Sequence, residues 1–271
     1  MDIISSVNNP KIKAYCALSS SNKERREKGL FVLEGLRLCQ DVLRSEYFIE
    51  ELFYTKENEE NIKELISVSK NVYEIANHVA EKMADTKNTQ GVFCVVQISK
   101  NGIDVKNGID NKKKIDYSGK YVLLENVQDP ANLGAISRTA EAFGITGLIV
   151  SGGCDIYSPK AMRASMGALL RLQVLSTDDV TKTLDDAKNN GMKTFASVIS
   201  DDAINIKSCD FNGGIIVVVG NEANGITEEV IASCDYSITI RMSGKAESLN
   251  VGAAASIIIW EMVSRNEERK L

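Results

Sequence analysis

The chain has 271 residues, of which 44% are hydrophobic and 25% are charged, and its net charge is −5. The length and composition predict two ordinary globular domains. The negative net charge argues against a protein coated with nucleic acid. No apolar run approaches the roughly 18 residues of a membrane span, and the N-terminus lacks the basic start and apolar stretch of a secretory signal. Its six cysteines are scattered, without CxxC pairs or companion histidines, so we expect reduced thiols, a cytoplasmic location and no metal site.

The first 98 residues alternate between short apolar runs and amphipathic runs, which predicts a small α/β domain. The predicted strands are 31–35, 51–55, 71–75 and 92–97, and the predicted helices are 36–45, 58–70 and 77–85. Residues 99–118 then contain glycines, asparagines, three consecutive lysines and a repeated Asn-Gly-Ile-Asp. This segment is too long and too polar for an ordinary connection, so we interpret it as a linker.

From residue 119 to the end, the alternation resumes with nearly continuous apolar strands, which are typical of a parallel sheet covered on both faces. The predicted strands are 121–125, 147–151, 193–197, 215–219 and 236–240. Helices are predicted between them: Asp129-Pro130 and Ser158-Pro159 are start signals, and further helices cover 177–190 and 250–265. The sequence therefore predicts a doubly wound α/β domain behind the smaller one.

Three polar blocks in this second half follow apolar runs, and each combines glycine or small residues with carboxamide, guanidinium or hydroxyl groups. Such blocks suit a binding site at strand ends, where backbone approaches a ligand and a few polar groups orient it. The blocks span 126–144, 219–225 and 240–250, and their candidate site residues are Asn132, Arg138, Glu222, Ser248 and Asn250.

Taken singly, these residues have simpler interpretations. Arg138 lies off the apolar stripe of its predicted helix, so it is either a solvated arginine or a group that reaches a phosphate oxygen. Ser248 suits a helix N-cap and Asn250 a turn. The glycine turn of the second block matches neither G-x-G-x-x-G nor a P-loop, which disfavours dinucleotide and P-loop nucleotide binding.

A basic stretch near the N-terminus is a candidate phosphate-binding surface in an otherwise acidic protein. The alternative is a solvated helix with alternating charges. Aromatic residues for base stacking are sparse, so we expect a nucleic acid bound here to be recognised by its folded shape. The candidate nucleic-acid-binding residues are Lys11, Lys13, Lys23, Arg25, Arg26 and Arg37.

The three blocks resemble the three motifs of the SpoU/TrmH branch of the SPOUT superfamily, which are RNA ribose 2′-O-methyltransferases that use S-adenosylmethionine. The resemblance covers residues 121–261, including the segment 157–171, and the N-terminal stretches 5–13 and 31–37 resemble the ribosomal-protein-like substrate-binding domain often fused to this family. The chain departs from the family pattern at Ala223-Asn224, where Gly-Arg is common, and at Arg241, where proline is common.

The resemblance implies a C-terminal domain tied in a deep trefoil knot, a homodimer formed through that domain, and a structured RNA substrate, with ribosomal RNA favoured over transfer RNA. It also implies that the loops around Gly220 and from Ile240 to Leu249 hold S-adenosylmethionine without a metal. The implied cofactor-binding residues are Val219, Gly220, Asn221, Glu222, Ile240, Met242, Ser248 and Leu249.

The same resemblance implies catalytic roles for Asn132, Arg138, Glu222, Ser248 and Asn250. The only histidine, His78, lies in the first half, and arginine is a poor free base because its pKa exceeds about 12. We therefore interpret Arg138 as an electrostatic group that favours the developing alkoxide, with proton relay through a phosphate as the alternative. Two other functions stay open: a non-catalytic RNA-binding protein with this fold, and an RNA base methyltransferase of the same superfamily.

Overall fold

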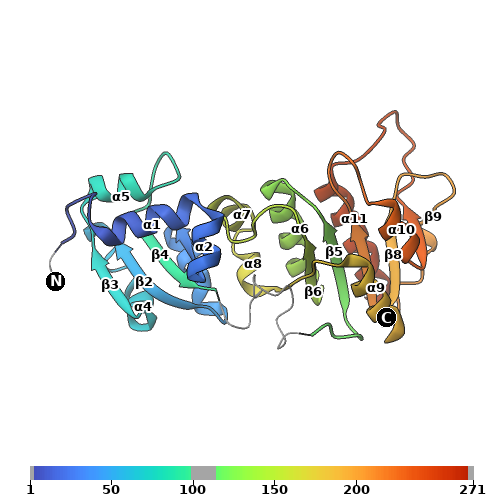
Figure 1. Cartoon of the computed structure of the whole chain (residues 1–271), viewed down its shortest axis with the longest axis horizontal. Coiled ribbons are helices and arrows are strands. Elements are labelled where there is room, and N and C mark those ends of the chain that lie inside the picture. Colours follow the sequence, from blue (N-terminus) through green and yellow to red (C-terminus); the bar gives the residue numbers. More distant parts are fainter. Residues whose placement is uncertain (1–2, 99–113, 268–271) are drawn as a thin grey trace. The chain divides into compact units, whose positions relative to one another are not determined.

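The structure of the chain is a computed structural model that describes residues 3–98 and 114–267. The chain forms two compact units (Figure 1). The first contains Met1–Lys100 and Asp155–Arg171, and the second contains Asn101–Cys154 and Leu172–Leu271. Most of the predicted linker, residues 99–113, lies outside the described residues. No helix in the described ranges is both long and apolar enough to cross a membrane.

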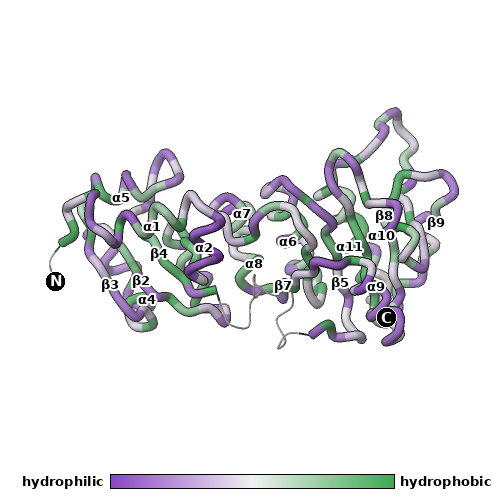
Figure 2. Tube along the Cα trace, viewed as in Figure 1, coloured by the Kyte–Doolittle hydropathy of each residue, from purple (hydrophilic) through white to green (hydrophobic). Residues whose placement is uncertain are grey.

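The first unit is built on a four-stranded sheet in the order β1-β4-β2-β3, counted over the described residues. The central β4 (Val92–Gln97), which is mostly hydrophobic in Figure 2, runs antiparallel to β1 (Leu30–Glu34) and β2 (Phe48–Tyr54), and β3 (Asn71–Glu74) joins β2 in parallel. Helices and 3-10 turns surround it: α1 (Pro10–Ser20), α2 (Asn22–Lys28), α3 (Leu36–Asp41), η1 (Val42–Arg44), η2 (Lys56–Asn58), α4 (Lys63–Val68) and α5 (Asn77–Met83).

The second unit is built on a parallel sheet whose described strands follow the order β7-β6-β5-β10-β8-β11-β9. The strands are β5 (Lys120–Glu125), β6 (Gly147–Ser151), β7 (Gln173–Ser176), β8 (Lys193–Ser197), β9 (Ile204–Asn205), β10 (Ile215–Val219) and β11 (Tyr236–Thr239); the 3-10 turn η3 (Ile206–Ser208) follows β9. Helices α9 (Val180–Asn189) and α10 (Glu228–Ser233) pack with Tyr121 and Leu123 of β5. Alternate residues of a strand face opposite sides, so both faces of this sheet need helices.

Helices α6 (Pro130–Ala142) and α11 (Val251–Glu267) lie side by side and parallel. The Thr139 and Ser256 hydroxyls are 2.9 Å apart, and one helical turn further on the Phe143 and Trp260 rings meet edge to face at 5.3 Å. Near the helix starts, an added Cβ at Gly252 would lie 3.3 Å from Ala135 Cβ. The small residue therefore permits this close packing, and the first turn of α11 lies beside the first turns of α6.

The segment Asp155–Arg171, which the sequence assigns to the second domain, belongs to the first unit. Asp155 pairs with the guanidinium of Arg25 at 2.7 Å, and the Tyr157 ring lies 4.9 Å from that of Phe31. The helix predicted for 160–170 is divided into α7 (Pro159–Ala164) and α8 (Ala168–Arg171) by Met166, whose φ is +50°. The predicted domains did not anticipate this placement of Asp155–Arg171, because sequence order does not reveal a segment that packs with an earlier part of the chain.

Most predicted strands match observed ones within a few residues, and the parallel α/β class is confirmed. The prediction omitted α1 and α2. The omission of α2 has a physical reason, because α2 buries only Arg25 and so carries no apolar stripe. It also omitted β7 and the two-residue β9. Phe143 follows the last residue of α6, Ala142, and is 40% exposed. The trefoil knot stays a prediction.

Candidate active site

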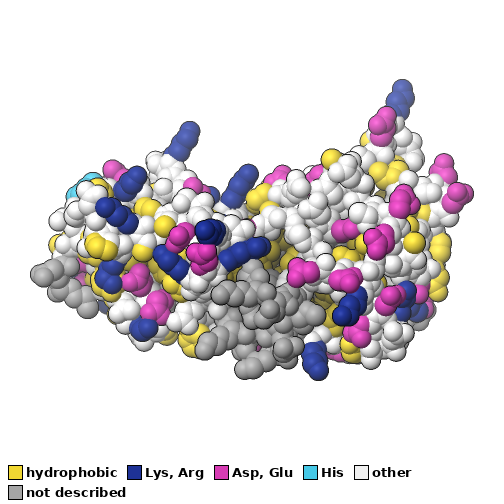
Figure 3. Space-filling model, viewed as in Figure 1, with side chains coloured by type: hydrophobic (Ala, Val, Ile, Leu, Met, Phe, Trp, Pro, Cys, Tyr) yellow, Lys and Arg dark blue, Asp and Glu magenta, His cyan; other side chains and the backbone are white. Residues whose placement is uncertain are grey.

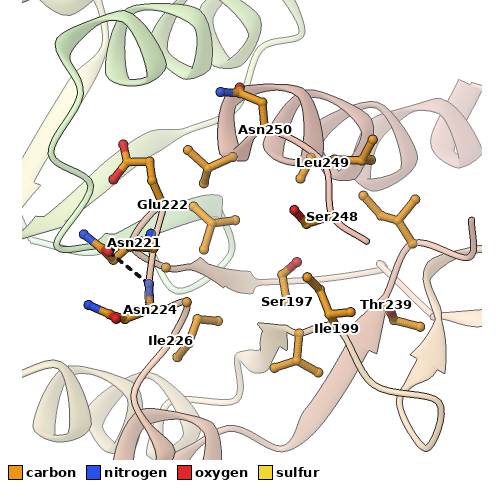
Figure 4. Close-up of a pocket in the computed structure, with 18 of the residues that line it drawn as sticks. Ser197, Ile199, Asn221, Glu222, Asn224, Ile226, Thr239, Ser248, Leu249 and Asn250 are labelled. Carbon is orange, nitrogen blue, oxygen red and sulfur yellow. Dashed lines mark hydrogen bonds between the residues drawn. The ribbon is translucent and has the colours of Figure 1, made fainter. Parts of the chain in front are cut away.

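A cavity of about 550 Å³ opens where β8, β10 and β11 end (Figure 4). Apolar side chains such as Ile199, Ile226 and Leu249 form its walls, and the Ser197 and Ser248 hydroxyls point toward its centre. Its size and its mixture of apolar walls with a few polar groups are typical of a small-molecule or cofactor site. All the residues expected to bind the cofactor line it: Val219, Gly220, Asn221, Glu222, Ile240, Met242, Ser248 and Leu249.

The loop from Gly220 to Gly225, which follows β10, is a tight turn. Asn221 and Gly225 exchange two backbone hydrogen bonds of 2.9 Å. A Cβ on Gly220 would lie 2.2 Å from the carbonyl carbon of Gly225, so only glycine allows the two ends to approach so closely. The Asn221 amide oxygen accepts from the Ala223 and Asn224 N–H groups, and its nitrogen donates to the Asn126 carbonyl. The loop is therefore fixed from within and from the end of β5.

The far end of this loop is also fixed to β5. The Thr227 hydroxyl and N–H donate to the two carboxylate oxygens of Glu125 at 2.7 and 3.0 Å. Thr227 stands at the N-cap of α10, but its hydroxyl is donated to Glu125 and makes no cap hydrogen bond. Neighbouring residues Glu125 and Asn126 thus hold both ends of the loop, and sequence reasoning identified neither role.

A chain of hydrogen bonds joins the three polar blocks. The Asn132 amide nitrogen donates to Glu222 Oε1 at 2.8 Å, and its oxygen accepts from the Asn250 amide at 2.9 Å. Asn132 is buried at the start of α6, so both of its amide groups are used inside the protein. This confirms that the strand-end blocks converge, and it gives Asn132 the central position between Glu222 and Asn250.

Glu222 accepts more hydrogen bonds than a surface carboxylate needs. Besides Asn132, the N–H groups of Gln128 and Asp129 donate to it at 3.1 and 3.0 Å. Burial is the largest single influence and acts to raise the pKa of Glu222, but the bonds from Asn132, Asp129 and Gln128 together lower it below its usual value. Glu222 is therefore held ionised, and it links the loop from Gly220 to Gly225 to the start of α6.

Glu222→Gln should lower the free energy of unfolding at pH 7 by about 1 kcal/mol, near the low end for a charge-assisted bond because the side chain is partly exposed. A lowered folded pKa stabilises the fold above the unfolded value of about 4.3, and this contribution disappears as the pH falls through the folded pKa. The difference between variant and wild type should therefore shrink near pH 3. Urea unfolding at both pH values measures it. The control Glu247→Gln removes an exposed glutamate of the third block and should change stability at neither pH.

Two of the predicted catalytic residues lie apart from this hydrogen-bond chain. Ser248 lines the cavity, but none of the described residues hydrogen-bonds to its hydroxyl. Arg138 is exposed on α6, does not line the cavity, and has no ion pair or hydrogen bond among the described residues. The structure of one chain thus brings together Asn132, Glu222, Ser248 and Asn250 and leaves Arg138 outside the cavity.

The predicted RNA-binding residues differ in their exposure. Arg25 is only 4% exposed, because it pairs with Asp155 and donates to the carbonyls of Leu18 and Ser19. Its assignment to an RNA surface is therefore wrong. Lys11 is half-buried against Glu51 and Tyr73. The other four residues are exposed: Lys13, Lys23, Arg26 and Arg37. On the face that Figure 3 shows, the lysines and arginines of the first unit stand among acidic side chains and do not form one continuous basic surface.

Sequence reasoning missed several residues that line the cavity, among them Ser197, Ile199 and Thr239. Ser197 and Thr239 end strands that were predicted, so the rule that ligands bind at the carboxyl ends of parallel strands would have identified them. Within the described ranges, no group of three or more His, Cys, Asp or Glu side chains is arranged to hold a metal ion, and none of the six cysteines forms a disulfide.

Comparison with known proteins supports the interpretation of both units. Residues 119–260 match the model of the SpoU rRNA Methylase family, and residues 9–94 match an MRM3-like substrate binding domain. The chain is 25% identical over 263 residues to the 23S rRNA (guanosine(2553)-2'-O)-methyltransferase RlmP of Bacillus subtilis, covering 97% of this chain and 99% of that protein. It is 28% identical over 263 residues to an uncharacterized tRNA/rRNA methyltransferase of Synechocystis, with 95% and 92% covered.

Solved structures agree with the sequence matches. The AdoMet-bound rRNA methyltransferase from Sinorhizobium meliloti superposes with a TM-score of 0.82 at 25% identity, covering 97% of this chain and 98% of that one. The three polar blocks, the cavity between them and the matched range 119–260 all fall on the same part of the chain. This chain belongs to the SpoU rRNA methylase family.

Proposed function

We propose that this protein transfers a methyl group from S-adenosylmethionine to a ribose 2′-hydroxyl in structured RNA. The observation that carries the proposal is the hydrogen-bond chain from Glu222 through Asn132 to Asn250, which joins all three polar blocks at the edge of one cavity. The relative named as a 23S rRNA guanosine 2′-O-methyltransferase supports the reaction and favours ribosomal over transfer RNA as the substrate.

The cavity fits S-adenosylmethionine in size and chemistry. Its apolar walls suit an adenine ring, while hydroxyl, amide and backbone groups at the strand ends suit ribose hydroxyls and the amino-acid part. The fixed turn at Gly220 provides a backbone wall that does not need to rearrange on binding. When bound, the cofactor supplies an activated methyl group and a good leaving group, so the protein chiefly needs to align the acceptor hydroxyl and remove its proton.

We propose the following catalytic roles. Asn132, Glu222 and Asn250 position the loops, and Ser248 presents a hydroxyl that no described protein group uses. Arg138 supplies a permanent positive charge that holds the phosphate next to the reacting ribose and favours the developing alkoxide. The only histidine, His78, is exposed in the first unit and contacts the Ser5 carbonyl, so it takes no part.

A homodimer through the second unit is part of the proposal. Helices α6 and α11 present two adjacent exposed stripes that contain Phe143, Ile257 and Trp260, at 40, 38 and 50% exposure, beside Arg138. Clustered exposed aromatic and aliphatic side chains are typical of protein interfaces. A second copy on this face would lie next to Arg138, the one predicted catalytic residue that a single chain leaves outside the cavity.

RNA capture is assigned to the first unit, in accord with its match to a substrate-binding domain. The reversals Lys23→Glu and Arg26→Glu should weaken RNA binding and reduce its salt dependence by about one unit of slope per lost phosphate contact. Filter binding at several salt concentrations measures both. The matched control, Lys56→Glu with Lys63→Glu, changes the charge equally at two exposed lysines paired within their own turns. Equal weakening by both pairs of substitutions would exclude a specific role for α2.

Mass spectrometry of nucleosides from ribosomal and transfer RNA tests the function, using cells with and without the protein. Loss of one ribose-methylated nucleoside supports the proposal. Loss of a base-methylated nucleoside would assign the alternative reaction, and unchanged RNA would favour a binding protein with this fold. A cytoplasmic place of action is part of the proposal, because none of the six cysteines forms a disulfide. Calorimetry in chelator should still detect S-adenosylmethionine binding, because the proposed site uses no metal.

A further inference from the structure

The loop that follows β11 forms one wall of the cavity and has a single polar attachment. Among residues 241–249, only Arg241 makes a hydrogen bond or ion pair with another described part of the chain. Its Nη1 donates to Asp201 Oδ1 at 3.0 Å, and its Nη2 donates to the Asp201 backbone carbonyl at 2.7 Å. All but Met242 of this loop is exposed, so packing provides little additional restraint.

The opposite wall of the cavity, formed by the segment that follows β8, is also exposed. Val198 and Ile199 line the cavity directly after β8, and Ile199 is 72% exposed, on the same side of the cavity as Thr239 in Figure 4. Asp201 lies two residues beyond Ile199. The contact between Arg241 and Asp201 therefore connects the two open walls near the strand ends.

Arg241 itself does not line the cavity, although Ile240 and Met242 on either side of it do. Its side chain extends to Asp201, so its effect on a bound molecule is indirect: it fixes the backbone that carries its two neighbours. A proline would fix this backbone through its ring, whereas an arginine can restrain it only through a partner, and Asp201 is that partner.

We propose that Arg241 and Asp201 are positioning residues that hold the two walls of the S-adenosylmethionine cavity together. This inference rests on the proposed cofactor site. Without the pair, the free loop is less ordered, and binding has to order it at a cost in affinity. An exposed ion pair is a weak restraint, so the expected effect is a two- to fivefold loss of cofactor affinity, in line with a coupling of about 0.2–1 kcal/mol.

The test compares wild type, Arg241→Ala and Asp201→Asn by calorimetry with S-adenosylmethionine at low and high salt. Arg241→Ala should raise Kd about two- to fivefold at low salt, and the difference should shrink at high salt because screening weakens the wild-type pair. Asp201→Asn keeps both acceptor oxygens but removes the charge, so it should show a smaller rise. At saturating cofactor, kcat should equal that of the wild type, and so should the Tm measured without cofactor, since cofactor stabilises each variant according to its own Kd.

Arg241→Pro distinguishes restraint of the loop backbone from a direct contact between the Arg241 side chain and the cofactor. None of the described residues accepts a hydrogen bond from the Arg241 N–H, so proline removes no bond there. If the side chain acts by restraining the backbone, Arg241→Pro should restore the wild-type Kd. Lys193→Ala is the matched control: it breaks an exposed pair with Asp210 in the same unit, at the opposite end of β8, and should leave Kd unchanged.

The outcomes distinguish the inference from the proposed function. If the wild type binds no S-adenosylmethionine, the cofactor site itself is wrong. If the wild type binds it and Arg241→Ala binds equally well, the positioning role is wrong and the cofactor site stands. If Arg241→Ala and Arg241→Pro weaken binding to the same degree, the arginine contacts the cofactor directly, and the restraint is again excluded.

Discussion

Arg138→Ala should lower methyl transfer by about a hundredfold or more, the effect typical of removing a preorganised electrostatic group from an active site. The affinity for S-adenosylmethionine should stay unchanged, because Arg138 is exposed on α6 and does not line the cavity. Single-turnover kinetics with the natural RNA and calorimetry with the cofactor measure the two quantities separately.

Arg138→Lys helps to define the role of the charge. Lysine keeps the positive charge but lacks the planar fork that binds a phosphate through two hydrogen bonds, so partial activity is expected. Arg44→Ala, which removes an exposed arginine of the first unit, is the control for loss of charge alone. Near-normal turnover of Arg138→Ala would identify Arg138 as an ordinary solvated arginine, the simpler interpretation of its place on the helix.

Trp260→Glu should convert the proposed dimer to a monomer. Trp260 is 50% exposed and stacks edge to face on Phe143. Truncating an aromatic residue central to an interface typically costs about 2 kcal/mol or more, which corresponds to roughly a thirtyfold weaker association. A buried carboxylate adds to that cost. Sedimentation velocity over a range of protein concentrations measures the change.

Phe48→Glu is the matched control, because Phe48 is an exposed aromatic residue of the first unit, whereas α6 and α11 belong to the second. It should leave the association state unchanged. If Trp260→Glu is monomeric and also loses methyl transfer while retaining the cofactor, the active site depends on the second copy. A wild type that is monomeric at all concentrations would exclude the dimer, and an unaffected Trp260→Glu dimer would place the interface elsewhere.

The sequence by itself determined the α/β class and the position of the three polar blocks. Apolar runs such as Ile215–Val219 are long enough and pure enough to identify buried parallel strands. Sequence signals for helix starts are equally reliable, because a capping residue bonds to residues next to it in the chain. The side chain of Asp129, for example, caps α6 as its position before Pro130 predicts.

The tertiary structure decided everything that depends on pairs distant in sequence. Arg25 looked like a phosphate-binding residue among other basic residues, yet Asp155, 130 positions later, holds it inside the first unit. The same contact places Asp155–Arg171 with the first unit. Charge pattern alone could not reveal this, because a buried arginine and an exposed one have the same sequence signature until the partner is known.

In the candidate site, too, the sequence identified residues and the tertiary structure decided their contacts. The strand-end blocks and their resemblance to the SpoU/TrmH motifs together selected Asn132, Glu222 and Asn250, because strand ends and small residues mark where a ligand can approach. Only the fold showed that Asn132 bonds to both of the others. Only the fold, too, left Arg138 outside the cavity. Hydrogen bonds depend on distances of about 3 Å and on direction, and these are set when the sheet brings loops together, not by the order of residues.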